Sequence, residues 1–165
     1  MSTSGTFTYH YTVGIERVAE LIRDSNFLEQ RCASSGENNV KVTVEPIAEG
    51  YRVIIARDAA VELPIFAKHL FRARNRIVDD ILWRREGTSW IGEYTIAPSG
   101  FPGTIRGRSE ISPTLEGCKH ESSFLVAVKI PVLGAKLERF LVDRITKGFA
   151  DADRRNAEQL ERRAS

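Results

Sequence analysis

Three side chains of the sequence could transfer a proton from the inward face of a predicted strand: His120, Tyr94 and Asp79. His120 is separated from Phe124 and Val126 by even numbers of positions, so it shares the apolar face of the last predicted strand with them. An imidazole in a pocket can act as an acid or a base near neutral pH. The alternative is that His120 lies at the open end of its strand, near Gly117, and contacts water. The sequence alone leaves both interpretations open.

Tyr94 and the Asp79-Asp80 pair each have an ordinary structural alternative. The Tyr94 hydroxyl group could orient a ligand in an apolar pocket, or it could be bonded to a neighbour in a packed core. Asp79 and Asp80 are adjacent on a strand, so they face opposite ways and cannot form a carboxylate dyad. The one that faces inward needs a partner, because an unpaired buried charge is costly. The conservative interpretation is a salt bridge at the sheet edge with Arg76 or Arg84.

The patterns of known catalytic and metal sites are absent from the sequence. There is no glycine-rich phosphate loop, no HExxH segment and no nucleophile elbow. The 3 histidines and 2 cysteines are too dispersed to indicate a catalytic triad or a metal site. We therefore assign no catalytic residue and expect no metal and no cofactor. The distant pair Cys32 and Cys118 indicates no disulfide framework, which favours a reducing cytoplasm.

A basic segment from Pro64 to Arg76 combines cations with apolar side chains. It contains no acidic residue, and the apolar residues Phe66 and Leu70 lie among its cations: Lys68, His69, Arg72, Arg74 and Arg76. Such a segment suits the entrance of a pocket for an anionic amphiphile, with the three arginines as headgroup ligands. A solvated surface helix also explains it. The net charge of the whole chain is only +2, which does not favour nucleic-acid binding.

Length and hydropathy predict one domain without a membrane segment. The chain has 165 residues, which is typical of a single domain. No run of about 18 apolar residues is present, so we expect no membrane-spanning helix. The first residues are small and polar and lack the features of a signal peptide. We predict a flexible segment at residues 1–5 and a folded core at residues 6–162.

A long C-terminal helix is the element that must cover the candidate residues. It is predicted over Ala135–Arg162, after a break at Pro131 and Gly134. Its apolar residues recur at spacings of three and four and form one stripe: Leu137, Phe140, Leu141, Ile145, Phe149 and Ala152. The preceding chain predicts a strand from Thr6, two short helices and six further strands. This order predicts an α+β fold in which an antiparallel sheet of about seven strands holds the helix on its concave face.

This order of elements resembles the helix-grip order of the START-like superfamily, also called SRPBCC. The junction Ile130-Pro131-Val132-Leu133-Gly134-Ala135-Lys136-Leu137-Glu138 is similar to the Val-Pro-Leu-Val-Gly-Gly-Lys-Leu-Glu junction of a branch of unknown function that is common in actinobacteria. The resemblance covers residues 6–160. It implies a cavity between the sheet and the long helix for lipids, sterols, polyketides or other apolar ligands. The superfamily also includes polyketide aromatases and cyclases.

The sequence does not decide whether the space beneath the helix is hollow or filled. Four inward positions hold small side chains, which leave room that a packed core would fill: Gly92, Gly107, Ser109 and Ser122. A sheet bent by glycine, with larger neighbours filling the gap, explains the same residues.

We predict a domain that binds a hydrophobic or amphipathic small molecule, rather than an enzyme. The expected lining residues come from strands, the long helix and two connecting segments: Phe66, Leu70, Tyr94, Phe101, Phe124, Leu137, Leu141 and Ile145. Phe101 is expected to form a gate with the segment that follows Pro64. One alternative is a cyclase-like enzyme that uses His120, Tyr94 or an inward aspartate. The other is an interaction module with a filled core that docks a partner through its basic segment.

Overall fold

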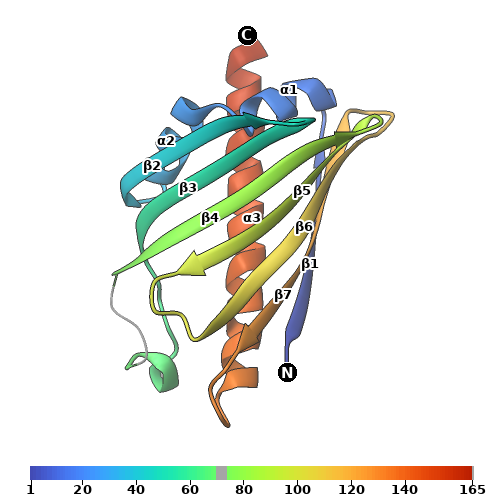
Figure 1. The fold of residues 1–165 in the computed structure, drawn as a ribbon. Coiled ribbons are helices and arrows are strands. Elements are labelled where there is room, and N and C mark those ends of the chain that lie inside the picture. The colour runs from blue at the N-terminus through green and yellow to red at the C-terminus, as the bar shows by residue number, and fades with distance from the viewer. Residues whose placement is uncertain (70–73, 165) are drawn as a thin grey trace.

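One curved antiparallel sheet and one long helix form the frame of the molecule (Figure 1). The computed structural model describes residues 1–69 and 74–164. The sheet has the strand order β1-β7-β6-β5-β4-β3-β2, with β1 (Thr3–Tyr11), β2 (Asn38–Ile47), β3 (Gly50–Ala60), β4 (Arg74–Glu86), β5 (Ser89–Pro98), β6 (Gly103–Pro113) and β7 (Cys118–Val128). The helices are α1 (Ile15–Leu21), α2 (Ser25–Ser34), the short 3-10 helix η1 (Ile65–Ala67) and α3 (Gly134–Ala164). These elements confirm the predicted α+β helix-grip fold.

The first strand begins earlier than the sequence predicted. Thr3 pairs with Val126 of β7 and Gly5 pairs with Phe124, so these residues belong to the sheet rather than to a flexible terminus. The small polar residues at the start of the chain hide the alternation that marks a strand. A Cβ atom on Gly5 would collide with the ring of Phe124, so glycine permits this close packing.

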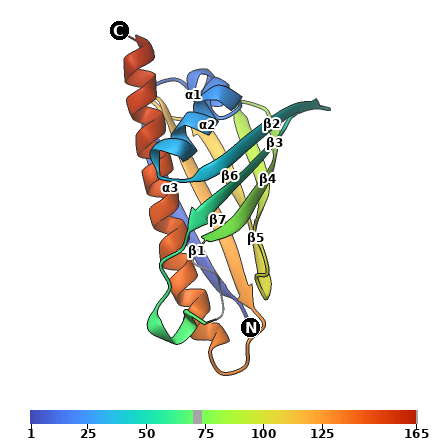
Figure 2. The same ribbon diagram turned by 90° about the vertical axis from the view of Figure 1, so that its left-hand side faces the viewer.

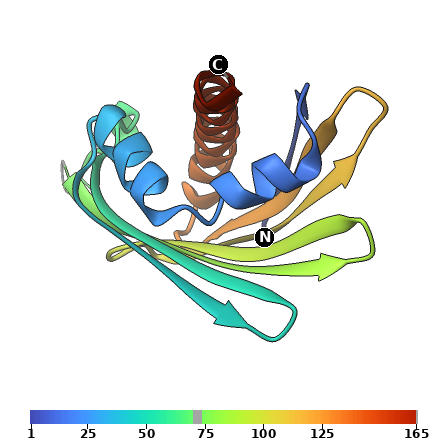
Figure 3. The ribbon, with the colours of Figure 1, turned by 90° about the horizontal axis from the view of Figure 1, so that it is seen from above.

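The two short helices close one end of the curved sheet, beside the C-terminal part of α3 (Figures 2 and 3). Asp24 caps α2, because its side chain accepts a hydrogen bond of 3.1 Å from the backbone N–H of Phe27. The side chains enclosed by α1, α2, the sheet and α3 are buried and include Val18, Leu21, Phe27, Leu28, Val53, Trp83, Trp90, Ile111 and Leu160. This end of the interior is therefore a filled core.

Both cysteines lie in the filled core, and their thiols offer a test of it. Burial raises the pKa of Cys32 and of Cys118 to about 11. The thiolate is the reactive form, so we expect neither thiol to react with a disulfide reagent at pH 8 in the folded protein. Both are expected to react once urea has unfolded the chain. Rapid labelling of the folded protein would contradict the packing described for this end.

Close contacts hold the start of α3 against the sheet. Gly134 approaches β7 so closely that a Cβ atom there would lie 2.9 Å from the carbonyl oxygen of Val128. The buried carboxylate of Glu138 accepts hydrogen bonds from the backbone N–H of Val128 (2.9 Å) and from the hydroxyl group of Thr3 (2.8 Å). From this anchor, α3 runs along the concave face of the sheet toward the end that α1 covers (Figures 2 and 3).

Candidate functional site

The interior nearer the start of α3 is less tightly covered than the filled core. Apolar side chains of the sheet are only half-buried there, and so are apolar side chains of α3 that pack in the same cluster: Ile81, Ile96, Leu141, Ile145 and Phe149. We call the region defined by these five residues the lower interface. Apolar surfaces that keep solvent-accessible area on both the sheet and the helix are suited to an apolar ligand.

The predicted lining residues gather at the lower interface. Seven of the eight belong to one apolar cluster: Phe66, Tyr94, Phe101, Phe124, Leu137, Leu141 and Ile145. The eighth, Leu70, lies outside the described residues. Tyr94, Phe124 and Leu137 are fully buried, whereas the other four are half-buried. The half-buried four are therefore the members that an incoming molecule can touch without displacing the wall behind them.

Phe149 lies at the edge of the lower interface, where its ring packs against Phe7 and His120 as well as against Tyr94 and Phe124. Its ring centroid lies 5.8 Å from those of Phe7 and Tyr94, 5.9 Å from that of His120 and 6.0 Å from that of Phe124. These separations are typical of packed aromatic clusters. The sequence placed Phe149 on the apolar stripe of the helix but did not identify these contacts.

The small inward residues of the sheet do not create empty space. Cβ atoms on Gly92 and Gly107 would collide with the side chains of Trp83 and Tyr94, respectively, because large rings from the adjacent strand cover both glycines. The hydroxyl groups of the two serines are hydrogen-bonded, Ser122 to the Tyr94 hydroxyl (2.6 Å) and Ser109 to a nitrogen of His120 (2.9 Å). At these four positions, the interpretation in which neighbours fill the gap is the one the structure bears out.

His120 lies in a buried polar network beneath α3. Its Nδ1 lies 2.7 Å from Oδ2 of Asp153, and its Nε2 lies 2.9 Å from Oγ of Ser109. The hydroxyl group of Tyr11 donates to Oδ1 of Asp153 and accepts from Nδ2 of Asn156 (3.3 Å). All five residues are buried. The interpretation of His120 as a solvent-exposed residue at the strand end is therefore wrong.

Ser109, His120 and Asp153 are hydrogen-bonded in the same arrangement as a serine catalytic triad. Their surroundings favour a structural role. A nucleophile must reach a substrate carbonyl, and the side chain of Ser109 is only 3% exposed between the sheet and the helix. Both ring nitrogens of His120 already have partners. Burial and the charge of Asp153 raise the pKa of Tyr11 well above its usual range. The network therefore joins α3 to β1, β6 and β7 by satisfied hydrogen bonds.

Tyr94 is a second buried hydroxyl group, and its ionisation should be visible in alkaline stability. Burial raises the pKa of Tyr94 to about 12. The unfolded chain therefore loses this proton first, and the free energy of unfolding falls as the pH rises from about 10 toward 12. We expect Tyr94→Phe to cost about 1 kcal/mol at pH 7 and to show a shallower decline between pH 9 and 11. Urea unfolding at several pH values measures both, and parallel pH profiles would contradict the assignment.

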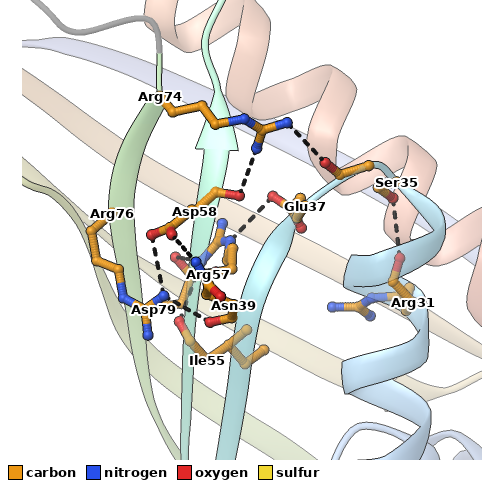
Figure 4. A network of polar contacts seen from close by, with 11 residues as sticks. Arg31, Ser35, Glu37, Asn39, Ile55, Arg57, Asp58, Arg74, Arg76 and Asp79 are labelled. Atoms are coloured by element: carbon orange, nitrogen blue, oxygen red, sulfur yellow. Dashed lines mark hydrogen bonds and ion pairs between the residues drawn. The ribbon is translucent and has the colours of Figure 1, made fainter.

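Asp79 faces inward, as one residue of the pair was expected to do, and it is paired with a half-buried arginine of β3. Nη1 of Arg57 lies 2.9 Å from Oδ1 of Asp79, and Nε of Arg57 lies 3.3 Å from Oε2 of Glu37 (Figure 4). Burial by itself would lower the pKa of Arg57, but the two carboxylates raise it above its usual range. One guanidinium group thus serves two carboxylates.

Asp80 faces outward and is paired with Arg52 through two hydrogen bonds of 3.0 and 2.7 Å. The predicted partners, Arg76 and Arg84, are therefore wrong for both aspartates. The actual partners come from β3, where Arg57 and Arg52 lie diagonally across the antiparallel pair from Asp79 and Asp80. Long side chains reach such diagonal neighbours. These pairs depend on the register between β3 and β4, which cannot be derived from the sequence alone.

The predicted headgroup arginines are bonded to the protein itself where the structure describes them. Nη1 of Arg74 donates to the carbonyl oxygen of Asp58 (3.3 Å). Nη1 of Arg76 donates to the carbonyl oxygen of Asn39 (2.7 Å) and lies 3.2 Å from a carboxylate oxygen of Asp58 (Figure 4). Arg72 lies outside the described residues. Arg74 and Arg76 thus brace the edge of the sheet near β2 and β3.

Within residues 1–69 and 74–164, no three histidine, cysteine, aspartate or glutamate side chains gather in a group that could hold a metal ion. The helices of the same ranges include none with the length and apolar character needed to cross a membrane.

The curved antiparallel sheet, the two short helices after β1 and the long helix on the concave face define the helix-grip fold of the START-like and Bet v 1-like proteins. Within that class, the chain belongs to the family described as Protein of unknown function (DUF2505), which matches residues 6–159. No curated protein sequence matches the chain.

Solved structures share this fold along nearly the whole chain. The protein TTHA0849 from Thermus thermophilus has a TM-score of 0.70 at 14% identity, covering 99% of this chain and 100% of that one. Ara h 8.0201 has a TM-score of 0.64 at 11% identity, covering 97% and 98%. A point mutant of Thalictrum norcoclaurine synthase, in complex with a transition state analogue, has a TM-score of 0.60 at 9% identity, covering 100% and 98%. Identities this low establish the fold alone.

Proposed function

We propose that this protein binds a hydrophobic or amphipathic small molecule, such as a lipid or a polyketide, at the lower interface. The observation that carries the proposal is the half-burial of apolar side chains on both the sheet and the helix, Ile81 and Ile96 with Leu141 and Ile145. A filled core lies directly beside them, so the loose packing is local. A ligand would bury this apolar area, at about 25 cal/mol per Å² before the cost of ordering.

The shared fold supports the binding of a small molecule. The norcoclaurine synthase structure with the same fold holds a transition state analogue. In the present chain, the polar network around His120 is shielded from the lower interface by Phe149. Binding without a chemical step is therefore the function we favour.

Phe66 and Phe101 are placed to admit the ligand. Both are half-buried members of the apolar cluster, and both lie in connecting segments rather than in strands of the sheet. The ammonium group of Lys136 lies 4.5 Å from the centre of the Phe66 ring. This cation–π contact is weak at an exposed position. We propose that Phe66 forms the gate together with Phe101.

The inward-facing carboxylate of Asp79 would also select among ligands. Asp79 faces inward next to Ile96, its register partner on β5. An anionic group placed there would be repelled, whereas a hydroxyl group or an amine could donate a hydrogen bond to the carboxylate. We therefore propose that the polar end of the ligand, where it reaches β4, is neutral or cationic.

Native mass spectrometry of the purified protein, followed by solvent extraction, tests the proposed function. The expected result is a mass adduct that solvent releases as a lipid or an aromatic compound. Titration with a neutral fluorescent sterol and with a fluorescent fatty acid serves as the second measurement. A clean apo mass together with no binding of either probe would contradict the proposal and favour a ligand-free interaction module.

We also propose that the protein is cytoplasmic and comes from the actinobacterial branch of its superfamily. The first proposal rests on two buried cysteines that carry free thiols. The second rests on the resemblance of residues 130–138 to that branch.

A further inference from the structure

The outer face of the sheet carries an open groove of about 900 Å³, on the side opposite α3. Figure 1 looks onto this face, with α3 behind the sheet. Arg106 and Arg108 of β6 lie in its centre, flanked through the strand register by Thr95 and Glu93 of β5 and by Leu125 and Ser123 of β7. The volume lies within the range of small-molecule sites, about 300–1,000 Å³. The groove and the lower interface lie on opposite faces of the sheet, and the buried side chains of Tyr94 and Phe124 border both.

The acidic side chains of the groove are already neutralised. Asp80 is held by Arg52 through two hydrogen bonds of 3.0 and 2.7 Å. Glu93 accepts a hydrogen bond of 3.2 Å from Arg84. Arginines of the same face therefore cancel the two negative charges that would otherwise repel an anion.

The two central arginines are not neutralised in this way. Among the residues that the structure describes, Arg106 makes no hydrogen bond or ion pair, and the nearest carboxylate oxygen to Arg108 is that of Glu110, at 3.8 Å. The two residues are separated by one position on β6, so their Cα atoms lie about 7 Å apart and their side chains share a face. Two guanidinium groups therefore stand side by side over the groove with unused donors.

Hydroxyl groups and exposed apolar side chains complete the surface. Thr6, Thr95 and Ser123 line the groove, and their hydroxyl groups make no side-chain hydrogen bond within the described part of the chain. Leu82 and Leu125 also line it and keep 40% and 39% of their surface exposed. The groove thus offers hydrogen-bond donors in its centre with apolar contact from β4 on one side and from β7 on the other.

We propose that this groove binds a phosphomonoester that carries an apolar body. A phosphate dianion matches two guanidinium groups in charge, and its three terminal oxygens can accept from both arginines and a hydroxyl group at once. A carboxylate has two oxygens and one charge, so it would leave part of this donor set unused. Leu82 and Leu125 bury the apolar body, which distinguishes the ligand from free phosphate.

Isothermal titration calorimetry with octyl phosphate, kept below its micelle concentration, tests the proposal. The wild-type protein is expected to bind octyl phosphate about tenfold or more tightly than inorganic phosphate. Burial of the octyl group contributes about 0.8 kcal/mol of binding free energy per CH₂ group. Arg106→Gln and Arg108→Gln are each expected to weaken octyl phosphate binding about tenfold, the loss of a charge-assisted contact. Lys41→Gln is the control, an exposed cation of β2 that does not line the groove, and is expected to bind as the wild type does.

Three results would overturn the proposal. Absence of octyl phosphate binding by the wild type would leave the groove without this ligand class. Equal affinity for inorganic phosphate would remove the apolar body from the recognition. Wild-type affinity in both Arg106→Gln and Arg108→Gln would place the bound octyl phosphate elsewhere, for example at the lower interface. All of these variants change exposed side chains of the outer face, so folding is expected to survive and circular dichroism verifies it.

Discussion

Replacement of Asp153 by alanine is expected to lower the free energy of unfolding by about 3 kcal/mol. The carboxylate is 5% exposed and accepts hydrogen bonds from Tyr11 and from Nδ1 of His120. Its removal leaves two buried polar groups without an acceptor, and each unsatisfied group costs about 1–3 kcal/mol. The same substitution opens a small space under α3. Urea unfolding followed by circular dichroism measures the change.

Asp151→Ala is the matched control for this experiment. Asp151 lies on the same helix, one turn or less from Asp153, and it binds Arg154 (2.6 Å) and Arg155 (2.9 Å) in a partly exposed cluster. Loss of such surface ion pairs costs at most about 1 kcal/mol. Equal destabilisation by the two alanine variants would show that the buried network does not hold α3 on the sheet.

The core-facing stripe of α3 continues past Ala152, where the predicted apolar stripe ends. Continued at spacings of three and four, the stripe passes through Asp153, Asn156 and Leu160, all of which are buried. Polar residues on a core-facing stripe require buried partners. The signal was therefore present in the sequence.

Strand alternation predicted which way side chains point, but not what they touch. It placed His120 on the inner face of its strand and separated Asp79 from Asp80, and both inferences are confirmed. The partners Arg57 and Asp153 belong to other elements, and their positions follow from the register of β3 on β4 and from the rotation of α3. Long-range geometry of this kind is not encoded in local spacing.

The filling of the sheet interior was undecidable for the same reason. In the sequence, Gly107 indicates empty space because it has no side chain. In the structure, the register of β5 and β6 places Gly107 opposite Tyr94, whose ring covers it. In contrast, the fold could be predicted from features that are local to single elements. These are the break at Gly134, the apolar stripe of the helix after it and the alternation in the strands before it. Periodicity and turn residues therefore predicted the architecture, whereas packing between strands needed the structure.

Leu141→Arg is expected to abolish binding of a neutral apolar probe at the lower interface, with an affinity loss of more than about 100-fold. A charged guanidinium group in an apolar site costs several kcal/mol of desolvation, and about 2.7 kcal/mol corresponds to 100-fold in affinity. Leu141 is half-buried, so the arginine stem can direct its charge to water and the folded state is expected to survive. Titration with Nile red, a neutral dye, avoids attraction between the new cation and an anionic probe.

Ala150→Arg is the control that adds the same charge to the same helix on an exposed position. It should bind Nile red as the wild type does, because position 150 does not belong to the apolar cluster. Leu141→Ala provides a second measurement, since it removes apolar contact without a charge and should weaken binding by about tenfold or less. Unchanged binding in both Leu141 variants would exclude this face of α3 from the ligand site. Because α3 and the inner face of β4 and β5 are the surfaces that define the lower interface, the proposed site would then be wrong, whatever molecule the protein carries.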